Sequence, residues 1–241
     1  MGSFKGHVVP GTLFMAIGIW HVWSCLVRFV TDPRSFRVRV WSPVQGFDGK
    51  LKYLELYVVA IGAFVDLCIE LLYSTHLRFF VDGVLNPSHM NNFEHSAMLF
   101  MFFVFGVAAL ISQKTRYLPL PDRALCLIAA AAFFAPITTV TGAIFPTSFL
   151  VDLSCGIAIT LQGLWFYQTA FTLYGPMMPD GCQRNDDKIS CRSADSEVRG
   201  ELLANSQLFF MVFGVFTAIL VAYSFAASRY GHPELRQIVN S

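Results

Sequence analysis

Long apolar segments recur along this chain, and they constrain its fold more than any other feature of the sequence. A helix needs roughly 20 apolar residues to cross the core of a bilayer. Only 14% of the residues are charged, against about a quarter in soluble domains. The sequence therefore predicts a single integral-membrane domain, 1–241, that forms an all-α, polytopic transmembrane helical bundle in contact with the lipid bilayer. Its six predicted spans are about 9–29, 51–73, 93–111, 124–145, 149–174 and 202–227.

Basic residues predict how the spans are oriented. The loop after the first span, residues 28–52, carries six Lys and Arg residues against two Asp residues. Lys and Arg accumulate in cytoplasmic loops, so we expect this loop in the cytoplasm and the N-terminus in the lumen or outside the cell. With six spans, thirteen Lys and Arg residues lie on the cytoplasmic side and four on the other. The first span is too long for a signal-peptide core and is expected to be a retained anchor, which favours the secretory or endomembrane system.

The composition excludes some partners and leaves the reaction type open. The net charge is only +1, and no basic patch with interleaved aromatic residues is present, so nucleic acid is not expected as a partner. Protein partners are not specified by the sequence. No Gly-rich phosphate loop, Ser-His-Asp arrangement or Gly-x-Ser-x-Gly turn is recognisable, so the sequence does not decide whether the protein is an enzyme.

Ionisable residues inside the predicted spans are the main candidates for a functional site, because charges within a bilayer are costly. In the second span, three acids lie on one stripe of the helix at 100° per residue. The third span opens on an acid and an imidazole, and the first span contains a histidine. The candidates for a polar intramembrane cluster are Glu55, Asp66, Glu70, Glu94, His95 and His21.

Two interpretations of this cluster stay open. As a polar cavity between the second and third helices, it would relay protons or bind a divalent metal through His95, Glu55 and Asp66. As a structural feature, it would supply hydrogen bonds between helices, an interpretation that suits His21 better than a ligand role. No His-x-x-x-His spacing fixes a metal site.

Two cysteines, Cys182 and Cys191, are nine residues apart in the polar loop 175–201. On an oxidising side of the membrane they could form a disulfide, whereas in the cytoplasm they would stay reduced. Six spans place this loop in the cytoplasm, although its six acids set the side only weakly. The other four cysteines lie in predicted spans and are expected to behave as small apolar residues.

Three motifs carry a resemblance to a known family. They are FKGHVVPG at residues 4–11, NFEHSAM at 92–98 and LQGLWFYQ at 161–168. Together they resemble the transmembrane protein 45 family, in its plant viral-response-like branch. Glu55 occupies the position of the acid in that family's second helix. The resemblance implies a multi-pass, all-helical membrane protein whose molecular activity is unsettled.

One departure from the family pattern affects the expected topology. Members of the family that this chain resembles follow a seven-span plan. They usually carry a His-rich stretch with acids in and after the fourth helix. Here, residues 129–134 look like the start of that fourth helix and residues 139–146 like the end of the fifth. About one helix's worth of residues is missing between them. In a seven-span member the loop 175–201 would be lumenal, which favours the Cys182–Cys191 disulfide, whereas six spans disfavour it.

Three functions remain as hypotheses. The first is a non-enzymatic multi-pass endomembrane protein that acts through partners in trafficking, signalling or defence. The second is an intramembrane metal-dependent hydrolase or lipid-modifying enzyme that uses the acidic and histidine cluster. The third is a small proton or cation transporter, which six helices without internal repeats favour less.

Overall fold

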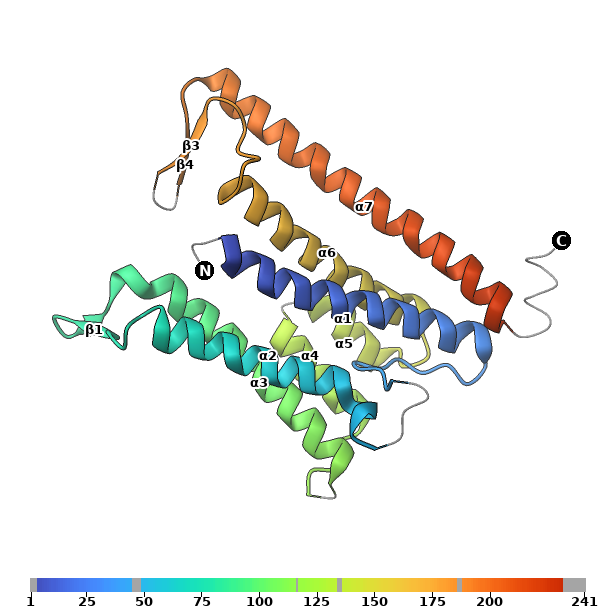
Figure 1. Cartoon of the computed structure of the whole chain (residues 1–241). Coiled ribbons are helices and arrows are strands. Elements are labelled where there is room, and N and C mark those ends of the chain that lie inside the picture. Colours follow the sequence, from blue (N-terminus) through green and yellow to red (C-terminus); the bar gives the residue numbers. More distant parts are fainter. Residues whose placement is uncertain (1–3, 45–48, 116, 134–135, 186–187, 232–241) are drawn as a thin grey trace. The chain divides into compact units, whose positions relative to one another are not determined.

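The computed structural model describes residues 4–44, 49–115, 117–133, 136–185 and 188–231, and it is helical over most of this length (Figure 1). Among the described residues, five helices are long and apolar enough to cross a membrane. The prediction of an all-α transmembrane fold is confirmed. The α-helices are α1 (Phe4–Thr31), α2 (Leu54–Cys68), α3 (Met90–Lys114), α4 (Asp122–Phe133), α5 (Pro136–Ile144), α6 (Phe149–Leu173) and α7 (Ala194–Tyr230).

The predicted span 124–145 corresponds to two short helices. α4 comprises Asp122–Phe133 and α5 comprises Pro136–Ile144, and residues 134–135 between them lie outside the described part of the chain. At 1.5 Å per residue, α4 is about 18 Å long and α5 about 14 Å, and neither crosses a hydrocarbon core of about 30 Å. The two helices pack against each other.

The chain forms two compact units, one made of residues 32–155 and the other of residues 2–31 and 156–241. In the first unit, α2 and α3 form an antiparallel pair. The backbone of α3 approaches α2 closely at Gly106, where an added Cβ would lie 3.0 Å from Ala60. The rings of Phe64 and Phe103 are 5.4 Å apart on the same pair of helices. Two short helical turns flank α2, namely η1 (Gly49–Tyr53) and the π-helical turn η2 (Ile69–Tyr73).

An extended segment, residues 36–44, lies at one end of the first unit. We call this the basic end, because the segment carries Arg37 and Arg39. The Val38 N–H donates to the carbonyl of Pro146, just after α5, at 2.8 Å. A recess of about 220 Å³ is lined by Trp41 of this segment, by Gln113 near the end of α3 and by Asp122 at the start of α4. The helical pair α4–α5 therefore begins and ends at the same end of the unit.

In the second unit, α1 runs antiparallel to α6 and parallel to α7. Gly18 of α1 lies directly against Thr160 of α6, since an added Cβ would meet Thr160 atoms at 2.5–2.9 Å. Near the end of α1, the Trp23 ring lies 6.1 Å from Phe225 and 6.2 Å from Tyr230, both near the end of α7. α1 and α6 thus form a tight seam of small residues, the packing that lets membrane helices approach closely.

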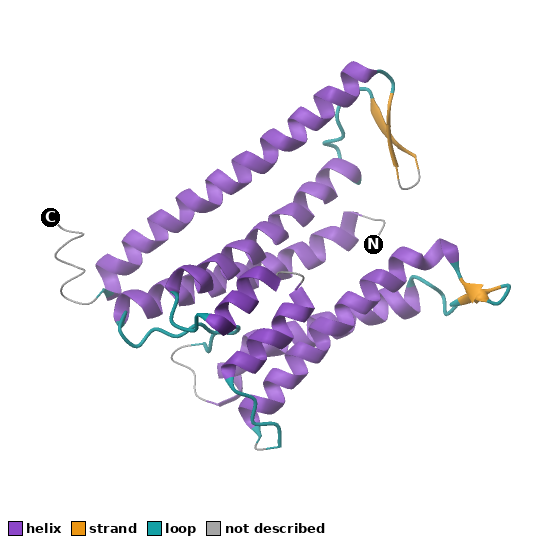
Figure 2. Ribbon diagram, turned by 180° about the vertical axis from the view of Figure 1, so that it is seen from behind, coloured by secondary structure: helices purple, strands orange, loops and turns teal. Residues whose placement is uncertain are grey.

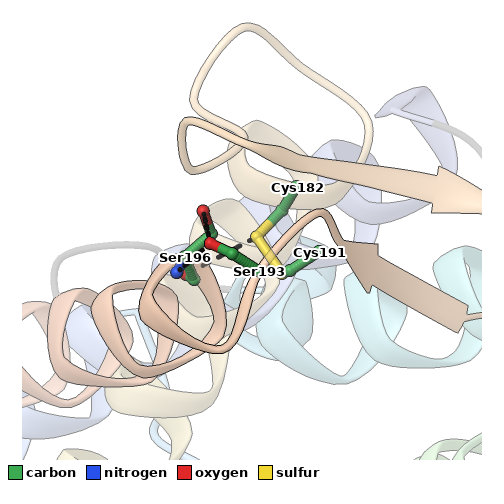
Figure 3. Close-up of a disulfide and its surroundings, with 4 residues drawn as sticks. All are labelled: Cys182, Cys191, Ser193 and Ser196. Carbon is green, nitrogen blue, oxygen red and sulfur yellow. Dashed lines mark hydrogen bonds between the residues drawn. A yellow bond between two sulfur atoms is a disulfide. The ribbon is translucent and has the colours of Figure 1, made fainter.

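Strands were not predicted, and among the described residues they are confined to two short hairpins (Figure 2). β1 (Phe80–Val81) pairs with β2 (Val84–Leu85) around a two-residue turn. The turn residues Asp82 and Gly83 have φ of 51° and 79°, as a type I′ turn requires. β3 (Cys182–Asn185) pairs with β4 (Lys188–Cys191), and a disulfide between Cys182 and Cys191 closes this hairpin (Figure 3).

Candidate functional site

The predicted acidic stripe of α2 is divided between the two ends of the helix. Glu55 lies at the basic end, where its Oε2 accepts the Ser42 N–H at 2.7 Å. Glu70 lies at the far end, in the π-helical turn, and its Oε2 accepts the Asn92 side-chain amide at 2.7 Å. The two acids are fifteen residues apart, about 22 Å along a helix axis. They therefore do not share a site.

The far end of the α2–α3 pair holds most of the remaining candidates. Glu70 is only 3% exposed, and half-buried Asp66, one turn earlier, is within electrostatic reach of it. His95 lies three residues after Asn92 and therefore on the same face of α3, with its Nδ1 atom buried. Glu94 is exposed. Asp66, Glu70 and the NFEHSAM motif thus meet at one end of the unit, in a turn type that is frequent at functional sites.

The three predicted metal ligands do not form one site. Glu55 and Asp66 are eleven residues apart on α2, about 16 Å along the axis, so a single ion cannot bind both. Among the described residues, no group of three or more His, Cys, Asp and Glu side chains could hold a metal ion. His21 is buried in the second unit, where its ring lies against α6 at Gly156, and it is therefore placed by helix packing.

A buried acid that we did not predict holds the basic end together with Glu55. Asp152, in the first turn of α6, is 1% exposed, and its Oδ1 accepts the Arg39 N–H at 3.3 Å. Two buried carboxylates from different helices thus accept backbone N–H groups of the same extended segment. The signal was present in the sequence, because a charged residue inside an apolar segment is a candidate by default.

The second unit contains a cavity that the sequence did not predict. Its volume is about 610 Å³, and α6, the β3–β4 hairpin and the first turns of α7 form its walls. Trp165 and Gln168 contribute from α6, Cys191 from the hairpin, and Glu197 and Glu201 from α7. Gln168 and Thr172 are hydrogen-bonded at 3.0 Å between Nε2 and Oγ1. The cavity combines apolar walls with a few polar groups, which is typical of small-molecule sites.

Local contacts fix the hairpin over this cavity. Gly181, just before β3, has φ of 82°, and a Cβ there would lie 2.5 Å from the Ser196 Oγ. Both the backbone conformation and the lack of space for a side chain therefore favour glycine. Ser193 caps α7 by accepting the Ser196 N–H at 3.2 Å, next to the disulfide (Figure 3). The Arg184 guanidinium of β3 lies 4.2 Å from the centre of the Tyr174 ring. The disulfide, the cap and the ring contact hold both ends of the hairpin.

A comparison with protein families identifies the family of this chain. The model of a family described as "Family of unknown function (DUF716)" matches residues 91–224, which is more than half of the chain. The matched region begins with the NFEHSAM motif and extends into α7, so it contains every residue named above as lining the cavity.

Proposed function

Because the chain belongs to the DUF716 family, which corresponds to the transmembrane protein 45-like proteins, we propose that it is a non-enzymatic multi-pass protein of the secretory or endomembrane system. We assign it to the plant viral-response-like branch, acting in trafficking, signalling or defence. In this proposal, the surface that binds partners is the lumenal end, which includes the disulfide-closed hairpin β3–β4. The single observation that carries the proposal is the parallel arrangement of α1 and α7.

Parallel first and last spans support an odd number of membrane crossings. Six crossings would make the first and last helices antiparallel, whereas the contacts of Trp23 with Phe225 and Tyr230 join the ends of helices that run in one direction. The α4–α5 pair supplies the reason, because it enters and leaves at the basic end without crossing. Five crossings, by α1, α2, α3, α6 and α7, return the 175–193 loop to the side of the N-terminus.

The charge distribution agrees with five crossings. Six basic residues lie in 28–52, three in 114–123 and two in 229–236, at and beyond the end of α7, which gives eleven on the proposed cytoplasmic side. Six basic residues are on the other side, three of them in the 175–193 loop and one, Arg199, near the start of α7. The bias is smaller than with six spans but has the same direction. The disulfide provides further support, since disulfides persist in oxidising compartments.

The positions of the acids favour the non-enzymatic function over the hydrolase. Glu55 and Asp152 both accept backbone N–H groups of one segment, which is a structural role. An intramembrane metal enzyme would have to rely on Asp66, Glu70 and His95, together with groups from outside the described residues. The transporter alternative has no additional observation in its favour.

Alkylation and metal analysis test the proposal. When membranes are dissolved in detergent without reductant, we expect Cys182 and Cys191 to resist maleimide and to react after reduction. In the Cys182→Ser variant, Cys191 should react at once. Reaction of both cysteines in the unreduced native protein would overturn the lumenal placement. Stoichiometric metal in the purified protein that is lost on His95→Ala would overturn the non-enzymatic function.

A further inference from the structure

We propose that the cavity beside the β3–β4 hairpin binds an amphiphile with one apolar chain and a protonated amine as its head group. The inference rests on the proposed function for one point, namely that this end of the second unit faces the lumen. The ligand would then enter from the lumenal leaflet. Its chemical class follows from the charge, the walls and the position of the cavity.

The charge of the cavity selects a cation. Glu197 and Glu201 are four residues apart and so lie on one face of α7, and both line the cavity. No Lys or Arg is among the described residues that line it. Arg199 is two residues from each acid and faces away from them on the helix. A protonated amine would meet two carboxylates without competition from a basic side chain of the described wall.

The apolar residues of the walls favour an apolar chain. Trp165 and Leu173 line the cavity from α6, and Ala204 lines it from α7. Trp165 also presents an aromatic surface, which attracts cations as well as apolar groups. The amide nitrogen of Gln168 donates to Thr172 and also contacts the amide oxygen of Gln207, so this nitrogen is occupied within the protein. Trp165, Leu173 and Ala204 thus offer contact with an apolar chain.

The cavity lies at the boundary between the polar head groups and the hydrocarbon core, which is where the head group of an amphiphile lies. α7 has 37 residues, or about 55 Å at 1.5 Å per residue, and a hydrocarbon core takes up only about 30 Å of it. Its charged residues, apart from Arg229, lie between Asp195 and Glu201, and the apolar sequence begins at Leu202. The carboxylates of the cavity are therefore at the head-group level, with the apolar wall one to two turns deeper.

The described lining of the cavity contains no basic group. This favours a single-chain amine over a zwitterionic phospholipid as the ligand. A zwitterionic phospholipid has a phosphate between its amine and its chains, and proteins bind phosphate through Arg, Lys or clustered N–H groups. A single-chain amine needs no such partner. We therefore favour the single-chain amine, and phospholipid binding is an outcome that the test distinguishes.

Quenching of tryptophan fluorescence tests the inference on the full chain in nanodiscs of neutral lipid. The probes are 12-bromododecylamine, 12-bromododecanol and 12-bromododecanoic acid, which share a chain and a quenching bromine but differ in the head group. We expect saturable quenching by the amine at several-fold lower concentration than by the alcohol, and none that saturates with the acid. The saturable part should disappear in Trp165→Phe, leaving the signal of the other three tryptophans. A competing excess of unbrominated phosphatidylethanolamine should not displace the amine.

Two pairs of variants locate the site. The double variant Glu197→Gln with Glu201→Gln should weaken amine binding by about fivefold for each carboxylate and leave alcohol binding unchanged, while Asp195→Asn serves as its control. Gly200→Leu should fill the cavity, because a Cβ at Gly200 meets its nearest atoms only at 3.6 Å. Gly214→Leu, on the same helix and with open space around it, should bind the amine normally.

Equal quenching by amine and alcohol, or unchanged binding in Gly200→Leu, would overturn the inference. Displacement of the amine by phosphatidylethanolamine would overturn the single-chain class. The assay is independent of membrane sidedness. Failed binding in a protein with a lumenal hairpin would therefore refute only this inference, and binding by a protein with a cytoplasmic hairpin would refute only the proposed function.

Discussion

The seam between α1 and α6 predicts a large difference between two chemically identical substitutions, Gly18→Ala and Gly214→Ala. At Gly18, the new Cβ would lie 2.6 Å from the Thr160 backbone nitrogen and 2.9 Å from its Cα. Heavy atoms that involve carbon are most stable at about 3.5–4.0 Å, so the helices must separate locally by about 1 Å. At Gly214, the Cβ meets no atom within 4 Å.

The magnitude follows from two opposing terms. Replacing glycine by alanine in a helix stabilises it by about 1 kcal/mol at either position. Forcing a methyl group into a well-packed interface costs about 1–3 kcal/mol, and only Gly18→Ala carries this cost. The two variants should therefore differ by about 1–3 kcal/mol, with Gly18→Ala the less stable.

Thermal unfolding of the purified protein in detergent measures this difference. At about 2–4 °C per kcal/mol for a chain of this size, the Tm of Gly18→Ala should lie several degrees below that of Gly214→Ala. The fluorescence of Trp20 and Trp23, on the same helix as Gly18, provides a local signal. A Gly18→Ala protein as stable as Gly214→Ala would refute the close approach of α1 and α6.

Two further predictions concern the basic end and the hairpin. Glu55→Ala leaves the buried Ser42 N–H without its carboxylate and should lower the free energy of unfolding by about 1–3 kcal/mol. Glu94→Ala, at an exposed position, should change it by about 0.5 kcal/mol or less. Equal Tm shifts in the two variants would contradict the role of Glu55 in holding the 36–44 segment. Reduction of the disulfide, which closes a loop of about ten residues, should remove about 2–3 kcal/mol of local stability. Hydrogen exchange should then accelerate in the 182–191 hairpin and not in α3, and the prediction fails if the exchange of the hairpin is unchanged.

The membrane class and most helix positions could be predicted because each long helix carries its own apolar segment. The five crossings that we propose could not. Residues 124–145 contain no charge, and two half-length helices in sequence look like one full span in apolar length. In the structure, the hydrogen bond from Val38 to Pro146 and the shared recess of Asp122 and Trp41 show that the pair begins and ends at one end of the unit.

The candidate site shows a second limit of sequence reasoning. The stripe of acids on α2 was predicted from angles around the helix, which say nothing of distance along it, and fifteen residues of axial separation divide Glu55 from Glu70. The type I′ turn at Asp82-Gly83 and the buried Asp152 both had recognisable signals in the sequence. The cavity had none, because Trp165 and Glu201 come together only through the fold of the hairpin between α6 and α7.

Engineered glycosylation measures the odd number of crossings most directly, because the chain contains no native Asn-x-Ser/Thr acceptor. Asp187→Thr creates the acceptor Asn185-Asp-Thr within the hairpin loop, and Gln45→Asn with Phe47→Thr creates one in the loop between α1 and α2. Glycans are attached only in the lumen. Five crossings with a lumenal N-terminus predict a glycan at Asn185 and none at position 45. Two unmodified acceptors would indicate an even number of crossings, and a glycan at position 45 alone would indicate the reverse orientation; either result would contradict a lumenal hairpin on a five-crossing protein.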